Sequence, residues 1–80
     1  MKITDIFSVE EFVLLTIDED LPEEIWIGDK VKINGELFTI AGIPIIDRTP
    51  PSADKKDFMI DRTDKTDKVN INQIVEFYKG

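Results

Sequence analysis

Hydrophobic and polar residues alternate along much of this chain, and a repeat of two residues is the pattern of a β-strand. The pattern is clearest in residues 31–40, where the dipeptide Asn34-Gly35 separates two short alternating runs. A two-residue hairpin turn needs positive φ at both central positions, and Asn-Gly adopts that conformation readily. We therefore predict an antiparallel hairpin with one buried face, formed by every second residue of its two arms: Val31, Ile33, Phe38 and Ile40.

Other runs predict strands on either side of this hairpin. An opening strand is expected within residues 3–9, and residues 12–17 are apolar on both faces, as in a strand covered on two sides. A further short strand is expected at residues 57–61. Before it, residues 48–57 contain two consecutive prolines and several charges, which predicts a long exposed loop.

The remaining segments complete an all-β pattern. Residues 25–27 predict a short strand in which Trp26 points away from the isoleucines that flank it. Residues 69–78 fit a strand or a helical stripe, and their β-branched and aromatic residues favour strands with a break near Asn72-Gln73. The polar tandem at 63–68 is interpreted as an exposed turn. We therefore predict an all-β fold, a small single-domain β-barrel of six or seven short antiparallel strands over residues 1–80.

The composition of the chain excludes many kinds of catalysis. It has 80 residues with no Cys and no His, so disulfides, Cys/His zinc sites, thiol nucleophiles and imidazole acid/base chemistry are not available to it. It also lacks the Gly-rich phosphate loop of nucleotide hydrolases. We therefore predict a protein that is not an enzyme and that binds no cofactor and no metal.

The charge of the chain bears on its partners. Ten Lys and Arg residues stand against 17 Asp and Glu residues, which gives a net charge of −7. This charge repels phosphate backbones, so a protein partner is favoured, RNA is disfavoured and DNA is not expected. The first residues do not form a secretory signal, and the longest apolar runs are too short to span a bilayer, so we expect a cytoplasmic protein without a membrane segment.

One motif has a counterpart in a known family. Residues 28–33 read Gly-Asp-Lys-Val-Lys-Ile and are followed by a turn glycine, and residues 72–75 read Asn-Gln-Ile-Val. They resemble the Gly-Asp-x-Val-x-Ile segment and the closing Gly-Gln-x-Val of domain II in translational GTPases such as elongation factor Tu. The predicted strands fall in the same order as those of that domain over nearly the whole chain. The resemblance implies an accessory β-barrel that is not itself a GTPase.

The chain also departs from that family. The glycines of the family's Gly-x-Val-x-x-Gly-Arg pattern are absent from residues 11–17, and acidic residues follow where the family has arginine. Those differences weigh against contacts with RNA of the kind that the family makes. A Gly-Asp-x-Val step before a hairpin also occurs in SH3-like barrels, so an SH3-like barrel with an unrelated binding function is an alternative.

An acidic run in residues 18–24 is the main candidate for chemistry other than binding. Two of its carboxylates could share a proton in a hydrolase or hold a weakly bound divalent cation. The run lacks the spacing of Gly and Asn found in calcium loops, so an exposed acidic turn is the simpler interpretation. Its members are Asp18, Glu19, Asp20, Glu23 and Glu24.

The candidate binding residues are Trp26, Arg48 and Arg62. Trp26 is the candidate anchor for a protein partner, because tryptophan is favoured at the centres of interfaces. The two arginines belong to residues 48–68, which hold six basic side chains against five Asp, and an RNA-contacting accessory barrel would depend on them. We predict a non-enzymatic interaction module that binds a protein partner through its loops and the surface around Trp26.

Overall fold

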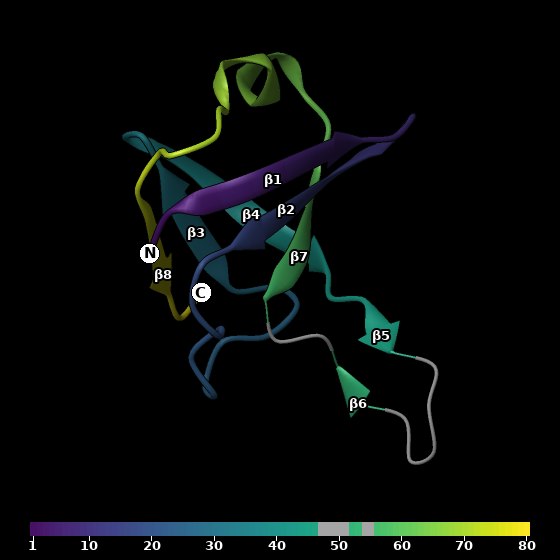
Figure 1. The fold of residues 1–80 in the computed structure, drawn as a ribbon, viewed down its shortest axis with the longest axis vertical. Helices are drawn as coiled ribbons and strands as arrows, with labels where there is room; N and C mark the ends of the chain where they lie inside the picture. Colours follow the sequence, from purple (N-terminus) through teal and green to yellow (C-terminus); the bar gives the residue numbers. More distant parts are fainter. Residues whose placement is uncertain (47–51, 54–55) are drawn as a thin grey trace.

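The structure, a computed structural model, describes residues 1–46, 52–53 and 56–80. Six strands form one antiparallel sheet in the order β1-β2-β7-β4-β3-β8, and two more form a short separate ribbon (Figure 1). This arrangement confirms the prediction of a small all-β fold with six antiparallel strands. The elements are β1 (Ile3–Ser8), β2 (Phe12–Ile17), β3 (Lys30–Ile33), β4 (Glu36–Gly42), β5 (Ile45–Ile46), β6 (Ser52–Ala53), β7 (Asp57–Asp61), the 3-10 helix η1 (Asp64–Lys68) and β8 (Val75–Tyr78).

The hairpin of β3 and β4 forms as the sequence predicts. Asn34 has a φ of 49° and Gly35 a φ of 87°, so both central residues of the turn have positive φ. Val31 lies opposite Phe38 in the resulting register. Every residue assigned to the buried face is buried, namely Val31, Ile33, Phe38 and Ile40.

The two end strands of the sheet are tied together at one end. The Ile3 N–H donates to the Gln73 carbonyl at 3.1 Å, and the Asn72 N–H donates to the Ile3 carbonyl at 2.8 Å. A third bond of 2.9 Å runs from the Val75 N–H to the Met1 carbonyl. The start of β1 therefore pairs with the segment that leads into β8, and Figure 1 shows the N-terminus beside β8.

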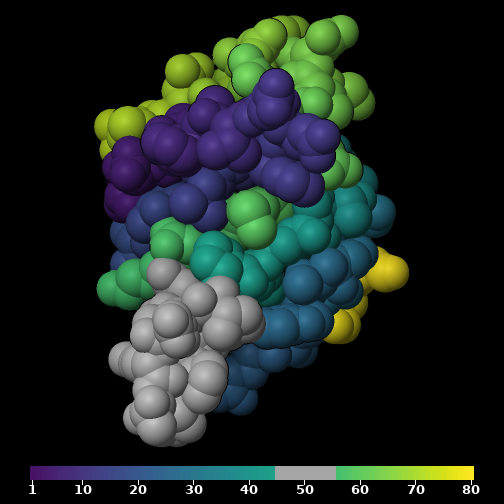
Figure 2. Space-filling view, turned by 90° about the vertical axis from the view of Figure 1, so that its right-hand side faces the viewer, coloured from purple at the N-terminus to yellow at the C-terminus, as the bar shows by residue number. Residues whose placement is uncertain are grey.

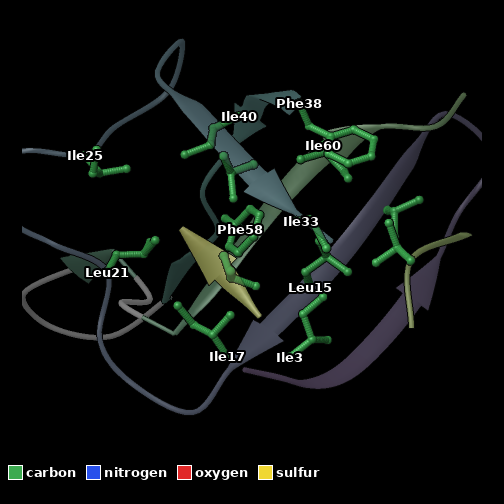
Figure 3. Packing of buried hydrophobic residues seen from close by; sticks show 14 of the residues in the cluster. Ile3, Leu15, Ile17, Leu21, Ile25, Ile33, Phe38, Ile40, Phe58 and Ile60 are labelled. Carbon is green, nitrogen blue, oxygen red and sulfur yellow. The ribbon is translucent and has the colours of Figure 1, made fainter. Parts of the chain in front are cut away.

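The core consists of the inward side chains of the sheet together with four residues outside it: Leu21 and Ile25 between β2 and β3, Ile43 after β4, and Val69 after η1. Leu15 of β2 and Phe58 of β7 are fully buried, and Figure 3 shows them pointing into one cluster with their neighbours. The Phe58 ring meets the Phe77 ring edge to face, with 5.3 Å between the ring centres. The loop residues Leu21 and Ile25 belong to the same cluster, so this loop is anchored to the core.

Three predicted elements differ from the structure. Residues 25–27 are not a strand, because one turn ends at Ile25, whose N–H donates to the Pro22 carbonyl, and a second turn begins at Trp26. Residues 69–73 are not a strand either, because positive φ at Asn72 bends the chain before β8. The predicted exposed turn at 63–68 is the helix η1, which begins with a capping box formed by Thr63 and Thr66.

Two predicted segments have different limits in the structure. The opening strand ends at Ser8, one residue before the predicted range ends. The predicted loop at 48–57 contains the short strand β6 and the first residue of β7, and most of its other residues lie outside the described part of the chain.

The hairpin turn provides a test of this fold. We expect Gly35→Ala to lower the free energy of unfolding by about 1–2 kcal/mol, because a side chain is strained at positive φ. No atom lies within 4 Å of the position that an added Cβ would occupy, so the cost is conformational. Gly35→Asn should cost less, because asparagine tolerates this conformation. Urea unfolding of both variants measures the effect, and equal stability of Gly35→Ala and the unchanged chain would contradict the assignment of the turn.

Candidate interaction site

The chain enters β3 through a tight turn over residues 26–29. The Asp29 N–H donates to the Trp26 carbonyl at 3.0 Å, and Gly28, the third residue of the turn, has a φ of 95°. A turn with positive φ at its third position favours glycine there. The Gly28 N–H donates to the Ile40 carbonyl, and the Ile40 N–H donates to the Asp29 carbonyl. Gly28 and Asp29 therefore lie opposite the single residue Ile40, and this arrangement is a β-bulge whose first residue is a glycine.

The carboxylate of Asp29 holds this turn and the C-terminal residues together. One of its oxygens, Oδ2, accepts the Trp26 N–H at 2.8 Å and the Lys79 ammonium at 2.8 Å. The other, Oδ1, accepts the Gly80 N–H at 3.1 Å. The Lys79 ammonium also donates to the Glu24 carbonyl. Figure 2 shows the C-terminal residues, in yellow, against the blue residues that precede β3.

These bonds favour the ionised form of the carboxyl group. The hydrogen bond from Lys79, followed by those from the Gly80 and Trp26 amides, lowers the pKa of Asp29 from its ordinary value of 3.8 to about 2. The residue is buried, so its negative charge depends on these donors. The sequence analysis identified the bend at Gly28-Asp29 but not the role of this carboxylate.

The turn presents two large apolar side chains to solvent. Trp26 and Ile27 are each 49% exposed, while Ile25 just before them is buried. The backbone of Trp26 is fixed on both sides, since its carbonyl and its N–H both bond to Asp29. Exposed acidic residues precede the pair along the same loop: Asp18, Glu19, Asp20, Glu23 and Glu24. The exposed apolar pair thus follows an acidic run in the same loop.

Of the two predicted arginines, Arg62 does not join this surface. The Arg62 N–H donates to the Glu11 carbonyl at 2.9 Å, and its guanidinium donates to the Val9 carbonyl at 3.3 Å. Arg62 therefore packs at the turn between β1 and β2, next to η1, whereas Figure 1 shows the loop that carries Trp26 at the opposite end of the molecule. Arg48 lies outside the described residues.

The acidic run makes separate contacts with the start of the chain. Asp18 Oδ1 accepts the Lys2 N–H at 2.9 Å, and this bond lowers the pKa of Asp18. Glu19 lies 3.5 Å from the terminal ammonium of Met1. Among the residues that the structure describes, no three acidic side chains converge in a way that could hold a metal ion.

The outer face of β4, β3 and β8 carries a second exposed group of side chains. Lys30 lies opposite both Thr39 and Tyr78, and the Lys30 ammonium donates to the Thr39 hydroxyl at 2.7 Å. The Tyr78 hydroxyl donates to a Glu76 carboxylate oxygen at 2.5 Å, and this bond raises the pKa of Tyr78. A shallow hollow of about 350 Å³ lies on this face, lined by Lys30, Lys32, Leu37 and Tyr78. Leu37, which lies on this face, was not among the predicted site residues.

Comparison of the chain with protein-family models, with curated proteins and with solved structures finds no match. The resemblance to domain II of translational GTPases therefore remains a hypothesis based on the motifs quoted above. Within the described ranges, no helix is long and apolar enough to cross a membrane.

The Asp29 carboxylate makes the stability of the fold depend on pH. Its pKa is lower in the folded chain than in the unfolded chain, so its contribution is complete above about pH 4 and is lost as the pH falls toward about 2. We expect Asp29→Asn to lower the melting temperature at pH 7. The difference from the unchanged chain should shrink between about pH 4 and pH 2.

Thermal unfolding followed by circular dichroism at several pH values measures this difference. Asp20→Asn, which neutralises an exposed carboxylate of the neighbouring acidic run, is the matched control and should show a much smaller loss at pH 7. A deficit of Asp29→Asn that stays constant from pH 7 to pH 2 would show that the charge of this carboxylate does not stabilise the fold.

Proposed function

We propose that this chain is a non-enzymatic interaction module that binds a protein partner through the surface around Trp26. The observation that carries the proposal is the exposure of Trp26 and Ile27 on a turn whose backbone is fixed by Asp29. A turn whose backbone is already held loses little backbone freedom on binding, so more of the burial of its exposed side chains contributes to affinity. Tryptophan residues held in this way are frequent hot spots of protein interfaces.

The proposed fold is a small β-barrel of the domain II kind. The hydrogen bonds between the start of β1 and the segment before β8 support this proposal. β1 and β8 are the two end strands of the sheet, and a barrel requires the two ends of its sheet to meet. The location of the quoted motif supports it too. Residues 28–33 form the bulge and then the whole of β3. The chain therefore bends into a hairpin at this motif, as the resemblance requires. An SH3-like barrel makes a similar bend and is the alternative for the fold.

The charge around Trp26 favours a particular kind of protein partner. Five exposed carboxylates precede the tryptophan along its loop, and Lys79, the nearby cation, is occupied by Asp29 and Glu24. This acidic loop and the net charge of −7 repel nucleic-acid phosphates, which supports a protein over RNA. The complementary surface is an apolar pocket with basic residues at its rim.

Replacement of Trp26 tests this proposal. The unchanged chain and Trp26→Ala would be used to capture partners from the native cytoplasm, with bound protein and bound RNA counted separately. The affinity for the captured protein would then be measured by calorimetry. We expect Trp26→Ala to weaken binding by at least about tenfold, since hot-spot residues contribute about 2 kcal/mol or more.

The matched control is Phe7→Ala, which removes an aromatic side chain that is 61% exposed on β1. It should leave the affinity unchanged, and both variants should keep the melting temperature of the unchanged chain to within a few degrees. Equal affinities of Trp26→Ala and the unchanged chain would remove Trp26 from the site. Capture of RNA alone, with binding that weakens steeply as salt rises, would favour the RNA-contacting alternative instead.

A further inference from the structure

A second surface with the features of a docking site lies around Leu37 on the outer face of β4. Leu37 is 55% exposed, and Tyr78 on the same face is 43% exposed. Lys32 lies between them in the sheet, opposite Leu37 on one side and Glu76 on the other. Leu37 and Tyr78 lie on the same face with β3 between them, and exposed large apolar groups that share a sheet face favour contact with another molecule.

Two hollows meet at Leu37. The first, of about 350 Å³, is the one lined by Lys30, Lys32, Leu37 and Tyr78. The second, of about 420 Å³, extends from Leu37 toward the end of β7 and the start of η1, and it is lined by Leu37, Phe38, Thr39, Asp61, Thr63, Asp64 and Lys65. Because Leu37 lines both, it stands between them as an apolar ridge.

The hollows on the two sides of Leu37 differ in charge. The first contains two ammonium groups, of which that of Lys30 is hydrogen-bonded to a neutral hydroxyl. The second contains the carboxylates of Asp61 and Asp64. Its one ammonium group, that of Lys65, lies 3.7 Å from a Glu36 carboxylate oxygen. Basic side chains therefore line the hollow on one side of Leu37, with Glu76 opposite Lys32 and bonded to the Tyr78 hydroxyl, and two carboxylates line the hollow on the other side.

We propose that this surface, independently of the one around Trp26, binds an extended segment of a partner protein that carries charges of both signs. An apolar side chain of the segment packs on Leu37 and Tyr78. An acidic side chain on one side of it reaches Lys30 and Lys32, and a basic side chain on the other side reaches Asp61 and Asp64. Charge complementarity on both sides fixes the position of the segment along the face.

The same charges disfavour a nucleic acid. A single-stranded nucleic acid with a base stacked on Tyr78 would place its phosphates near the two lysines, and this attraction favours binding. The backbone would then continue past Leu37 into the hollow with Asp61 and Asp64, where each further phosphate would meet a carboxylate. A peptide can change sign along its length, whereas a nucleic acid backbone cannot.

Synthetic peptides test the proposal on the intact chain. The probe is an acetylated nine-residue peptide with two glutamates at one end, Leu-Phe-Leu in the middle, two lysines at the other end, and serine between these groups. Two comparison peptides carry only glutamates or only lysines at both ends, and a fourth has serine in place of the apolar centre. A nine-nucleotide oligouridylate provides the RNA comparison.

Nitrogen-15 NMR titrations report both the affinity and the place of binding. We expect the mixed-charge peptide to shift the amide signals of Lys32, Leu37 and Tyr78 and to bind at least about tenfold more tightly than each of the other three peptides. If the all-glutamate or the all-lysine peptide bound as tightly as the mixed-charge peptide, the assigned charge pattern would be overturned. Shifts of the same signals by oligouridylate alone would overturn the assignment to a peptide, and no shifts with any probe at millimolar concentration would overturn the site.

Variants then separate this site from other exposed apolar groups. Leu37→Ser should weaken binding of the mixed-charge peptide by at least about tenfold. Ile71→Ser, at a residue that is 52% exposed on the segment before β8, is the matched control and should leave it unchanged. Trp26→Ala should also leave it unchanged, so failure at this site is distinguishable from failure at the Trp26 surface. Loss of peptide binding in Trp26→Ala would contradict the independence of the two surfaces.

Discussion

The buried carboxylate of Asp29 accepts hydrogen bonds from a turn beside it and from two residues at the far end of the chain. Without these donors, a negative charge would be buried unpaired at the entrance to β3, which is strongly unfavourable. With them, the turn that carries Trp26, the bulge opposite Ile40 and the C-terminal residues take one fixed arrangement. The exposed apolar pair at Trp26 and Ile27 depends on this arrangement for its position.

One backbone donor on the outer edge of β1 is already occupied within the chain. β1 is an end strand, and beyond Ile3 it continues away from the segment before β8 (Figure 1). On this strand the Asp5 carboxylate accepts the Ile6 N–H at 3.0 Å, which occupies a donor that an added strand would need. Charged side chains at sheet edges oppose pairing with other chains in this way.

The parts of the fold that were predictable are those decided by neighbouring residues. Asn34-Gly35 determines the turn, the register and the buried face of the hairpin, because positive φ and alternation are local properties. Residues 25–27 alternate in the same way, yet they lie between two turns, and the hydrogen bonds of those turns outweigh the strand pattern. The helix η1 was not predicted, because the polar tandem has the composition of a turn, while the reciprocal bonds of Thr63 and Thr66 start a helix there.

The candidate sites were predictable only in part. Trp26 stands out by residue type, but strand parity does not explain its exposure, because residues 25–27 are not a strand and Ile27 is equally exposed. The role of Asp29 was not accessible, because its partner Lys79 is 50 residues away along the chain. Leu37 was overlooked because its significance comes from the hollows on both sides of it, one of which is completed by Asp61 and Asp64 from β7 and η1.

The most direct test of the central role of Asp29 is the titration of its carboxyl carbon by NMR, followed together with the amide signals of its two backbone donors. The account predicts a midpoint at about pH 2, with the Trp26 and Gly80 amide signals moving at the same pH. A midpoint near the ordinary carboxyl value of 3.8, or a Gly80 amide that does not respond, would contradict it.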